Sequence, residues 1–261
     1  MITISKDGTQ IAYDKIGKGP ALVLVDGAFC HRENGVTPRL VPLLSNHFTV
    51  FSYDRRGRGE STDTKPYSVE REIEDLEAIV GATMESPFVC GFSSGAALLV
   101  RSVAKGLPVN KIALFEPPYT AVNAADAPPE DAAARLLGLT DQGKRGEAVK
   151  YFMTKVMGMP AAIVFLFRLF GKSIWKKNEG VSHTLSYDIA VMGNFGVPKE
   201  IISKINVPTI VIGGEKSPKK LADAVNAAAQ GIPGSKIILL KDQSHNVSMK
   251  VLAPVLIDFF K

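Results

Sequence analysis

The chain has 261 residues and 46% hydrophobic content, which is enough for a large buried core in one or two domains. Its net charge of +5 comes from dispersed basic residues. We interpret the lysine clusters within 172–177 and 216–220 as solvated faces, so neither a nucleic-acid partner nor an anionic-lipid site is expected.

The cysteines and the apolar segments restrict the compartment. Two cysteines, Cys30 and Cys90, are fewer than a disulfide-dependent secreted fold uses. The N-terminus lacks a basic segment followed by an apolar one, so no signal peptide is recognised. The most apolar segment, 160–170, is too short to cross a bilayer and contains Arg168, so no stable membrane insertion is expected. A cytoplasmic protein is the default expectation, and nothing in the sequence indicates a metal ion or an organic cofactor.

Strand-like and helix-like segments alternate over the first 118 residues, which predicts an α/β domain. Two alternating segments around Asp7-Gly8 predict a hairpin, and the apolar run 21–25 predicts a strand that is covered on both faces. The predicted strands are 2–5, 10–16, 21–25, 48–53, 87–90 and 111–115, and the predicted helices are 38–44, 69–80 and 94–103. The alternation returns near the C-terminus, with strands at 208–212 and 236–240 and helices at 219–229 and 247–260.

No buried strand is recognisable between Tyr119 and about Asn206. This segment begins in an Ala-, Pro- and Asp-rich stretch and continues into helix-like sequence with many Met and Phe residues. We expect a core domain formed by 1–118 and 207–261, with 119–206 inserted after the sixth strand as a helical unit. Its Met and Phe side chains are expected either to line a binding site or to form the small core of the unit itself.

Ser93 lies in the pentapeptide Gly91-Phe92-Ser93-Ser94-Gly95, between a predicted strand and a predicted helix. A serine in such a tight strand-to-helix turn is held out over the sheet, where a base can reach it. The glycines two positions before and after the serine are needed because side chains there would clash in the turn. The pentapeptide alone is a weak signal, but the strand, turn and helix together predict a nucleophilic serine.

Four motifs, in this order along the chain, resemble the α/β-hydrolase fold superfamily. They are the turn Val25-Asp26-Gly27-Ala28, the loop 53–61, the pentapeptide around Ser93, and the run 243–247 that contains His245. The resemblance covers essentially the whole chain and is strongest to small, capped bacterial hydrolases. It implies an α/β-hydrolase fold, with a mostly parallel central sheet, helices on both faces, and 119–206 as the helical cap. In this family the loop at 54–61 is structural, with arginines that bond backbone carbonyls.

The resemblance also implies roles for individual residues. Ser93 would be the nucleophile, and His245, between the last predicted strand and the last predicted helix, would be the base. The backbone N–H groups of Ala28 and Ser94 would form the oxyanion hole. The family usually has histidine where this chain has Asp26. This carboxylate could anchor the turn or tune the pocket, and we favour the anchoring role.

The chain departs from the family pattern at the position of the acid that orients the histidine. Most relatives carry an aspartate in a Gly-x-x-Asp arrangement after the strand at 208–212, but the fourth position of Gly214-Glu215-Lys216-Ser217 is serine. Some members take the acid from the end of the preceding strand, where this chain has Glu116. We therefore predict that Glu116 orients His245 and stabilises its cationic form.

Other interpretations of the acid stay open at this point. Glu116 could instead tether the turn at Pro117-Pro118 that follows it. Glu215 and Asp188 are alternative acids, and a Ser–His pair without an acid is a further one. Asp242 lies too close to the histidine in sequence to reach its far nitrogen.

Together these expectations predict a serine hydrolase, most simply a carboxylesterase, that acts on an uncharged, moderately lipophilic ester or related acyl substrate. The same triad supports C–C bond hydrolysis or a cofactor-free lyase reaction, and the fold alone does not choose among them. A ligand-binding protein with reduced catalysis is a third alternative, because Ser217 and Asp26 depart from the family pattern. We expect a small-molecule substrate as the partner, and a homodimer is left open.

Overall fold

The structure, a computed structural model, describes residues 1–122 and 126–261 and centres on an eight-stranded sheet. The strands are β1 (Ile2–Ile4), β2 (Gln10–Gly17), β3 (Ala21–Val25), β4 (Thr49–Tyr53), β5 (Phe88–Phe92), β6 (Lys111–Phe115), β7 (Thr209–Gly214) and β8 (Lys236–Leu240). They lie in the order β1-β2-β4-β3-β5-β6-β7-β8. The pairs β1–β2 and β2–β4 are antiparallel and the other neighbouring pairs are parallel, which confirms the predicted mostly parallel sheet.

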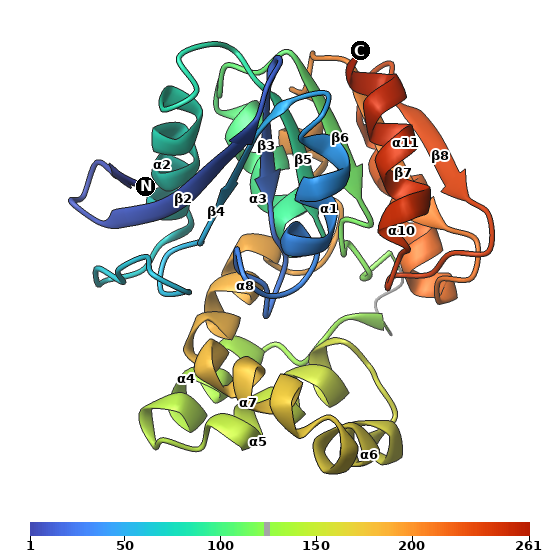
Figure 1. Cartoon of the computed structure of the whole chain (residues 1–261). Helices are drawn as coiled ribbons and strands as arrows, with labels where there is room; N and C mark the ends of the chain where they lie inside the picture. Colours follow the sequence, from blue (N-terminus) through green and yellow to red (C-terminus); the bar gives the residue numbers. More distant parts are fainter. Residues whose placement is uncertain (123–125) are drawn as a thin grey trace.

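Helices cover both faces of the sheet, as predicted (Figure 1). One face packs against α1 (Thr37–Leu44) and α11 (Met249–Phe260), and the other against α2 (Val69–Gly81), α3 (Ser94–Ala104) and α10 (Lys219–Gly231). Strand β3 shows how the sequence specifies this arrangement, because all five of its residues are buried. Leu22 and Leu24 pack on the α1 side while Val23 and Val25 pack on the α3 side, since successive side chains of a strand point to opposite faces.

The predicted strands and helices of this sheet region are all present, and their ends shift by two residues or fewer. Strand β5 shows one shift that matters for the site. It continues to Phe92 rather than ending at Cys90, so Ser93 follows the strand directly and Ser94 begins α3. Cys90 is fully buried in the strand, as a small apolar residue would be.

The described residues between β6 and β7 form helices and no strand, as expected. They are α4 (Ala132–Asp141), α5 (Arg145–Tyr151), the π-helical turn η2 (Phe152–Val156), α6 (Ala161–Phe170), α7 (Lys172–Gly180), the 3-10 turn η3 (Ser182–Thr184), α8 (Leu185–Met192) and α9 (Lys199–Ile202). In Figure 1, α4 to α8 gather beyond one end of the sheet, at the bottom of the view. Residues 123–125 of the predicted cap lie outside the described residues, and the division at 119 and 206 stays a prediction.

The Met- and Phe-rich part of this segment differs from the expectation in one respect. Phe152 and Met153 are buried, but five large apolar residues of α6 are 46–79% exposed. These five are Ile163, Phe165, Leu166, Leu169 and Phe170. They neither line a pocket nor fill a core, because α6 turns its apolar side outward. None of the helices in the two described ranges is both long and apolar enough to span a membrane.

The turn around Ser93 requires glycine on both sides for steric reasons. A Cβ atom on Gly95 would lie 2.3 Å from the carbonyl oxygen of Val25 and 2.6 Å from that of Asp26. A Cβ atom on Gly91 would lie 2.7 Å from the Cα atom of Ala96. In each case the obstructing atoms belong to the backbone, which cannot rotate away as a flexible side chain can. The glycines therefore let α3 begin directly against the end of β3.

Substitution of Gly95 tests this close approach. We expect Gly95→Ala to lower the free energy of unfolding by about 1–3 kcal/mol, because the added methyl group forces α3 away from the turn that follows β3. The measurement is urea denaturation followed by circular dichroism. Gly138→Ala in α4 is the matched control, because a Cβ atom there meets nothing within 4 Å. It should stabilise the protein by up to about 1 kcal/mol through helix propensity, and an equal effect of the two substitutions would contradict the steric account.

Candidate active site

Ser93 occupies a strained backbone conformation between β5 and α3, with φ 51° and ψ −122°. Positive φ is uncommon for a residue with a side chain and persists only where the surroundings enforce it. Here the flanking strand and helix do so, together with a 2.9 Å hydrogen bond from the Ser93 N–H to the carbonyl oxygen of Phe115 on β6. The conformation leaves the Ser93 side chain partly exposed at the wall of a cavity.

His245 lies in the loop between β8 and α11, and its ring is held by a carboxylate. Nδ1 of His245 lies 2.6 Å from Oε2 of Glu116. Because an ionised carboxylate only accepts hydrogen bonds, Nδ1 carries the proton and Nε2 is left as the basic nitrogen. Gly214 allows this loop to approach β7, since a Cβ atom there would lie 2.5 Å from the carbonyl oxygen of Gln243.

Glu116 follows β6 directly and is fully buried, with a φ of 42°. Its Oε1 accepts hydrogen bonds from Ser217 Oγ at 2.5 Å and from the Gly214 N–H at 2.8 Å. Burial alone would raise the pKa of Glu116, but the hydrogen bonds from His245, Ser217 and Gly214 outweigh it and hold the pKa below its usual range. The carboxylate is therefore ionised at neutral pH and faces the imidazole with a negative charge.

Ser217, where the resemblance led us to expect an aspartate, donates its hydroxyl to the Glu116 carboxylate at the end of β6. The two positions thus share one place in the fold, and Glu116 supplies the charge there. The contacts of the other carboxylates differ. Glu215 accepts from the Asp242 N–H at 3.3 Å on the exposed surface, and Asp188 binds two arginines. The alternative of Glu116 as a tether for Pro117-Pro118 has no side-chain contact that supports it among the described residues.

The two residues expected to form the oxyanion hole lie at the same cavity. Ala28 and Ser94 both line it, and within the ranges that the structure describes neither of their N–H groups donates to another protein atom. Unpartnered backbone donors beside a strained serine are suited to bind an oxygen atom that develops negative charge. The structure therefore brings Ala28, Ser93, Ser94 and His245 to one cavity, with Glu116 buried behind the histidine.

Ser93 Oγ and the His245 ring share this cavity without a hydrogen bond between them in the described residues. Hydrogen bonds between a catalytic base and its proton donor often form or tighten only when a substrate is bound, so the absence of this one is compatible with proton transfer. About 36% of the His245 side chain is exposed, whereas Glu116 is completely covered. The base can thus reach a substrate, and the carboxylate that orients it is shielded from water.

The cavity has a volume of about 320 Å³ and a mainly apolar wall. Its apolar lining includes Phe29, Val36, Phe152, Val156, Met157 and Phe195. Two cationic residues also line it, and each already donates to a backbone carbonyl. Arg39 Nε donates to Gly35 at 3.0 Å, and Lys220 Nζ donates to Met157 at 2.6 Å. The mainly apolar side chains of this wall can bury a lipophilic ligand.

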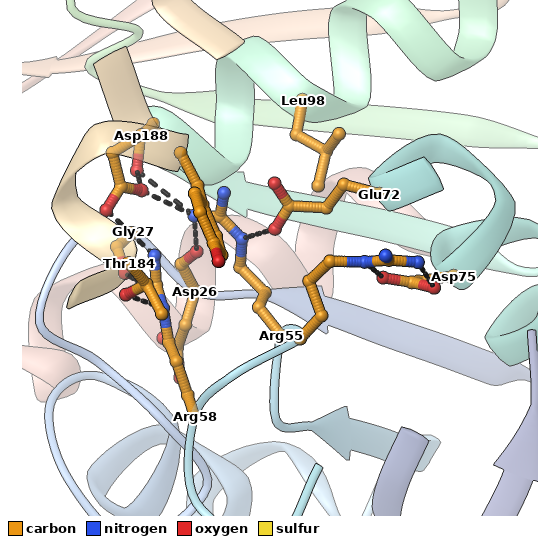
Figure 2. A network of polar contacts seen from close by, with 12 residues as sticks. Asp26, Gly27, Arg55, Arg58, Glu72, Asp75, Leu98, Thr184 and Asp188 are labelled. Atoms are coloured by element: carbon orange, nitrogen blue, oxygen red, sulfur yellow. Dashed lines mark hydrogen bonds and ion pairs between the residues drawn. The ribbon is translucent and has the colours of Figure 1, made fainter. Parts of the chain in front are cut away.

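A buried network of charged side chains links the segment 119–206 to the turn after Ser93 (Figure 2). Arg55, Arg58 and Asp188 are each at most 1% exposed. Oδ1 of Asp188, on α8, accepts from Ser94 Oγ at 2.7 Å and from Arg55 Nη1 at 2.8 Å. Oδ2 accepts from Arg58 Nη2 at 2.8 Å. Burial alone would raise the pKa of Asp188, but the charges of Arg58 and Arg55 outweigh it and lower the pKa below its usual range.

The same arginines hold the turn that carries Ala28. Arg58 Nη1 donates to the carbonyl oxygen of Gly27 at 2.6 Å, and Arg55 Nη1 donates to that of Asp26 at 3.3 Å. The loop after β4 is therefore structural, as expected, and its arginines bond backbone carbonyls. Asp188 binds both arginines and Ser94. This one carboxylate therefore links the turn that contains Ala28 to the start of α3 at Ser94.

Asp26 is buried beside this turn. Its Oδ2 accepts a 2.5 Å hydrogen bond from Thr37 Oγ1 at the start of α1, which supports the anchoring role that we favoured. Burial raises the pKa of Asp26 to about 7, and the Thr37 hydrogen bond and the Arg58 charge offset only part of this increase. Across residues 1–122 and 126–261 there is no cluster of three or more His, Cys, Asp or Glu residues that could hold a metal ion.

Sequence reasoning missed two contacts of this site. It named Asp188 only as an alternative acid, although the residue pairs with Arg55 and Arg58. It treated Ser217 as the absence of an expected aspartate and did not identify it as a hydrogen-bond donor to Glu116. Three buried arginines in one loop do signal that buried carboxylates must compensate them, but the pattern does not say which acids do so.

Known proteins resemble this chain over nearly its whole length. The model of the Alpha/beta hydrolase family matches residues 22–251. The crystal structure of an alpha/beta hydrolase from Sphaerobacter thermophilus has a TM-score of 0.93 and 43% identity, and the match covers 100% of both chains. The serine hydrolase BPHL of Mus musculus is 21% identical over 95% of this chain and 80% of its own length. A pimeloyl-(acyl-carrier protein) methyl ester esterase of Xanthomonas campestris is 24% identical over 89% of this chain and 90% of its own length.

Substitution of Glu116 tests whether its charge supports the histidine. We expect Glu116→Gln to lower kcat for ester hydrolysis by roughly 10⁴-fold, because the amide no longer stabilises the Nδ1–H tautomer or the imidazolium. Ser217→Ala is the matched control, because it removes one hydrogen bond to the carboxylate and leaves the charge in place. This control should lower kcat by about tenfold or less, a loss of one hydrogen bond.

A second substitution can supply the acid from the segment that follows β7 in place of the one that follows β6. Adding Ser217→Asp to Glu116→Gln places a carboxylate at the neighbouring position, so we expect kcat to recover at least partly. Steady-state kinetics of the four proteins gives the comparison. Full activity of Glu116→Gln alone would contradict the assignment of this residue.

Asp188→Asn tests the buried network. It leaves two buried arginines without their shared carboxylate, so we expect the free energy of unfolding to fall by about 3–5 kcal/mol. Ser94→Ala removes the hydroxyl that donates to Asp188 and accepts from Arg55, retains the Ser94 N–H, and should cost about 1 kcal/mol. Chemical denaturation of both variants measures these values. A cost for Asp188→Asn no larger than that for Ser94→Ala would show that the arginines do not depend on this carboxylate.

Proposed function

The chain belongs to the alpha/beta hydrolase family, and we propose that within this family it is a serine hydrolase with Ser93 as nucleophile, His245 as base and Glu116 as acid. The observation that carries the proposal is the 2.6 Å contact between His245 Nδ1 and the buried, ionised Glu116. This contact leaves Nε2 as the basic nitrogen in the cavity that Ser93 also lines. A base and a strained serine in one apolar cavity are the arrangement that acyl transfer needs.

The proposed reaction begins when Ser93 Oγ attacks the carbonyl carbon of a bound ester. Nε2 of His245 takes the hydroxyl proton as the Oγ–C bond forms, because a neutral serine hydroxyl is a weak nucleophile. Glu116 stabilises the imidazolium that results and keeps the ring in its orientation. The imidazolium then returns the proton to the alkoxide oxygen, so the alcohol leaves and an acyl group remains on Ser93.

Water completes the cycle by the same route. His245 takes a proton from a water molecule as the water attacks the acyl carbonyl carbon. The imidazolium then returns this proton to Ser93 Oγ, and the carboxylic acid leaves. In both steps the carbonyl oxygen becomes an oxyanion, to which the N–H groups of Ala28 and Ser94 would donate hydrogen bonds. Each such donor is typically worth a 10²–10³-fold increase in kcat, roughly 3 kcal/mol. The network of Asp188, Arg55 and Arg58 supports this role by holding both segments.

The cavity wall suggests the class of substrate. Its apolar side chains, among them Phe29, Phe152 and Met157, favour an uncharged and moderately lipophilic acyl or alcohol group. No observation favours C–C bond hydrolysis, a lyase reaction or ligand binding with reduced catalysis over ester hydrolysis, so we propose the ester reaction.

Turnover of esters and covalent labelling together test the proposal. We expect p-nitrophenyl esters of intermediate chain length to be hydrolysed, and a fluorophosphonate probe to label Ser93, as located by mass spectrometry of peptides. Ser93→Ala should abolish both, while His245→Ala should slow both by several orders of magnitude. Ser94→Ala is the matched control for the labelling, since it removes the neighbouring hydroxyl but not the proposed nucleophile.

A folded protein that hydrolyses no ester of any chain length and takes up no probe would sink the hydrolase proposal. A small molecule that raises the melting temperature strongly without being consumed would then favour the ligand-binding alternative. Labelling at Ser94 rather than Ser93 would overturn the assignment of the nucleophile alone.

A further inference from the structure

Helix α6 presents its apolar side to solvent, which is the reverse of an ordinary surface helix. The sequence of α6 is AAIVFLFRLF, and in the described structure Val164 is its one buried residue. At about 100° per residue, the outward-facing residues occupy one continuous arc of roughly 160°. They are Ala162, Ile163, Phe165, Leu166, Leu169 and Phe170. Single exposed apolar residues are common, but a contiguous set of this kind marks an interaction surface.

The exposed arc is fixed in place rather than frayed. Val164 and Trp175 are buried with Val149 and Met153 in a small apolar cluster, which holds α6 and α7 together. The rings of Phe167 and Trp175 pack edge to face with centroids 6.0 Å apart. The inner side of α6 is therefore fully used in packing, and the outer side has no partner within the described chain.

The charges beside this arc are basic. Lys172 follows Phe170 by two residues, and Lys176 and Lys177 lie one helical turn further along α7. All three are exposed, and none of them forms an ion pair with a described residue. Exposed Ile174 on the same helix extends the apolar surface. An apolar helix face flanked by unpaired lysines combines the two features that bind a peripheral protein to an anionic lipid surface.

We propose that α6 and the start of α7 form a docking surface for anionic lipid membranes. The helix would lie in the plane of the lipid headgroups, with Phe165 and Phe170 inserted and Lys172, Lys176 and Lys177 against the anionic headgroups. We earlier interpreted these lysines as a solvated face, and the exposed arc beside them changes that interpretation. The proposal concerns reversible binding to a surface, because α6 has 10 residues and cannot cross a bilayer.

Charge argues against a second copy of the chain as the occupant. In a two-fold contact through α6, the three lysines of each copy would meet at one interface. The nearest acid on α7, Glu179, already accepts a 2.9 Å hydrogen bond from Trp175 Nε1. Glu147 is engaged by Arg168 and Lys150. Like charges would therefore face each other without compensation, whereas an anionic membrane supplies the opposite charge.

The docking surface lies close to the mouth of the cavity. Met157, which is 38% exposed and lines the cavity, follows η2 directly, and η2 packs against α6. A protein held on a membrane by α6 would have Met157 and its neighbours close to the lipid. Lipophilic molecules dissolved in the bilayer could then reach the apolar cavity over a short path.

Cosedimentation with lipid vesicles tests the docking surface and does not require catalysis, so its outcome is independent of the proposed hydrolase function. We expect binding to phosphatidylcholine vesicles that contain phosphatidylglycerol, weaker binding at high salt, and little binding to phosphatidylcholine alone. The triple variant Lys172→Gln/Lys176→Gln/Lys177→Gln should bind about a hundredfold more weakly, at roughly fivefold per lysine. Phe165→Ser/Phe170→Ser should abolish binding.

Met84→Ser is the matched control, because Met84 is 91% exposed and lies three residues after α2, a helix that is far from α6 in Figure 1. It should bind vesicles as the unchanged protein does, and thermal melting confirms that each variant folds. Absence of binding to the anionic vesicles would overturn the proposal. If the protein were then a dimer that Phe165→Ser/Phe170→Ser converts to monomers, the surface would be an interface between copies instead.

Discussion

A hydrogen bond between the buried carboxylate of Glu116 and Nδ1 of His245 is the interaction on which the rest of the site depends. It joins the end of β6 to the loop before α11, two segments that are 129 residues apart in the chain. An unpaired carboxylate at this depth would be costly, so the donors from His245, Ser217 and Gly214 are needed for its ionised form. The same contact gives the imidazole its tautomer and directs the basic nitrogen toward the cavity that contains Ser93.

A second buried carboxylate, that of Asp188, supports the turn that follows the nucleophile. Asp188 comes from the helical segment beyond the sheet, yet it binds the side chain of Ser94 and the arginines that hold the Gly27 turn. The helical segment therefore contributes to the candidate oxyanion hole as well as to the cavity wall. Because both carboxylates are buried and paired, neither can be lost without leaving an uncompensated charge or an orphaned donor.

The sequence pattern predicted the sheet, its helices and the nucleophile turn well, because apolar runs such as 21–25 and steric requirements such as that of Gly91 against Ala96 are local properties. Glu116 was predicted from its place after β6, by analogy with a minority of the family. The donor role of Ser217, the pairing of Asp188 and the outward face of α6 were not predicted. These features depend on which side chains meet in three dimensions, and residue type alone leaves several partners equally compatible.

The tautomer of His245 tests the account most directly. Nitrogen-15 NMR of the histidine rings distinguishes a protonated Nδ1 from a protonated Nε2, and His245→Gln identifies the signal that belongs to this residue. The account predicts that the neutral ring of His245 carries its proton on Nδ1, with a strongly downfield proton resonance that is lost in Glu116→Gln. A proton on Nε2, or a signal that Glu116→Gln leaves unchanged, would contradict the central role of the Glu116 contact.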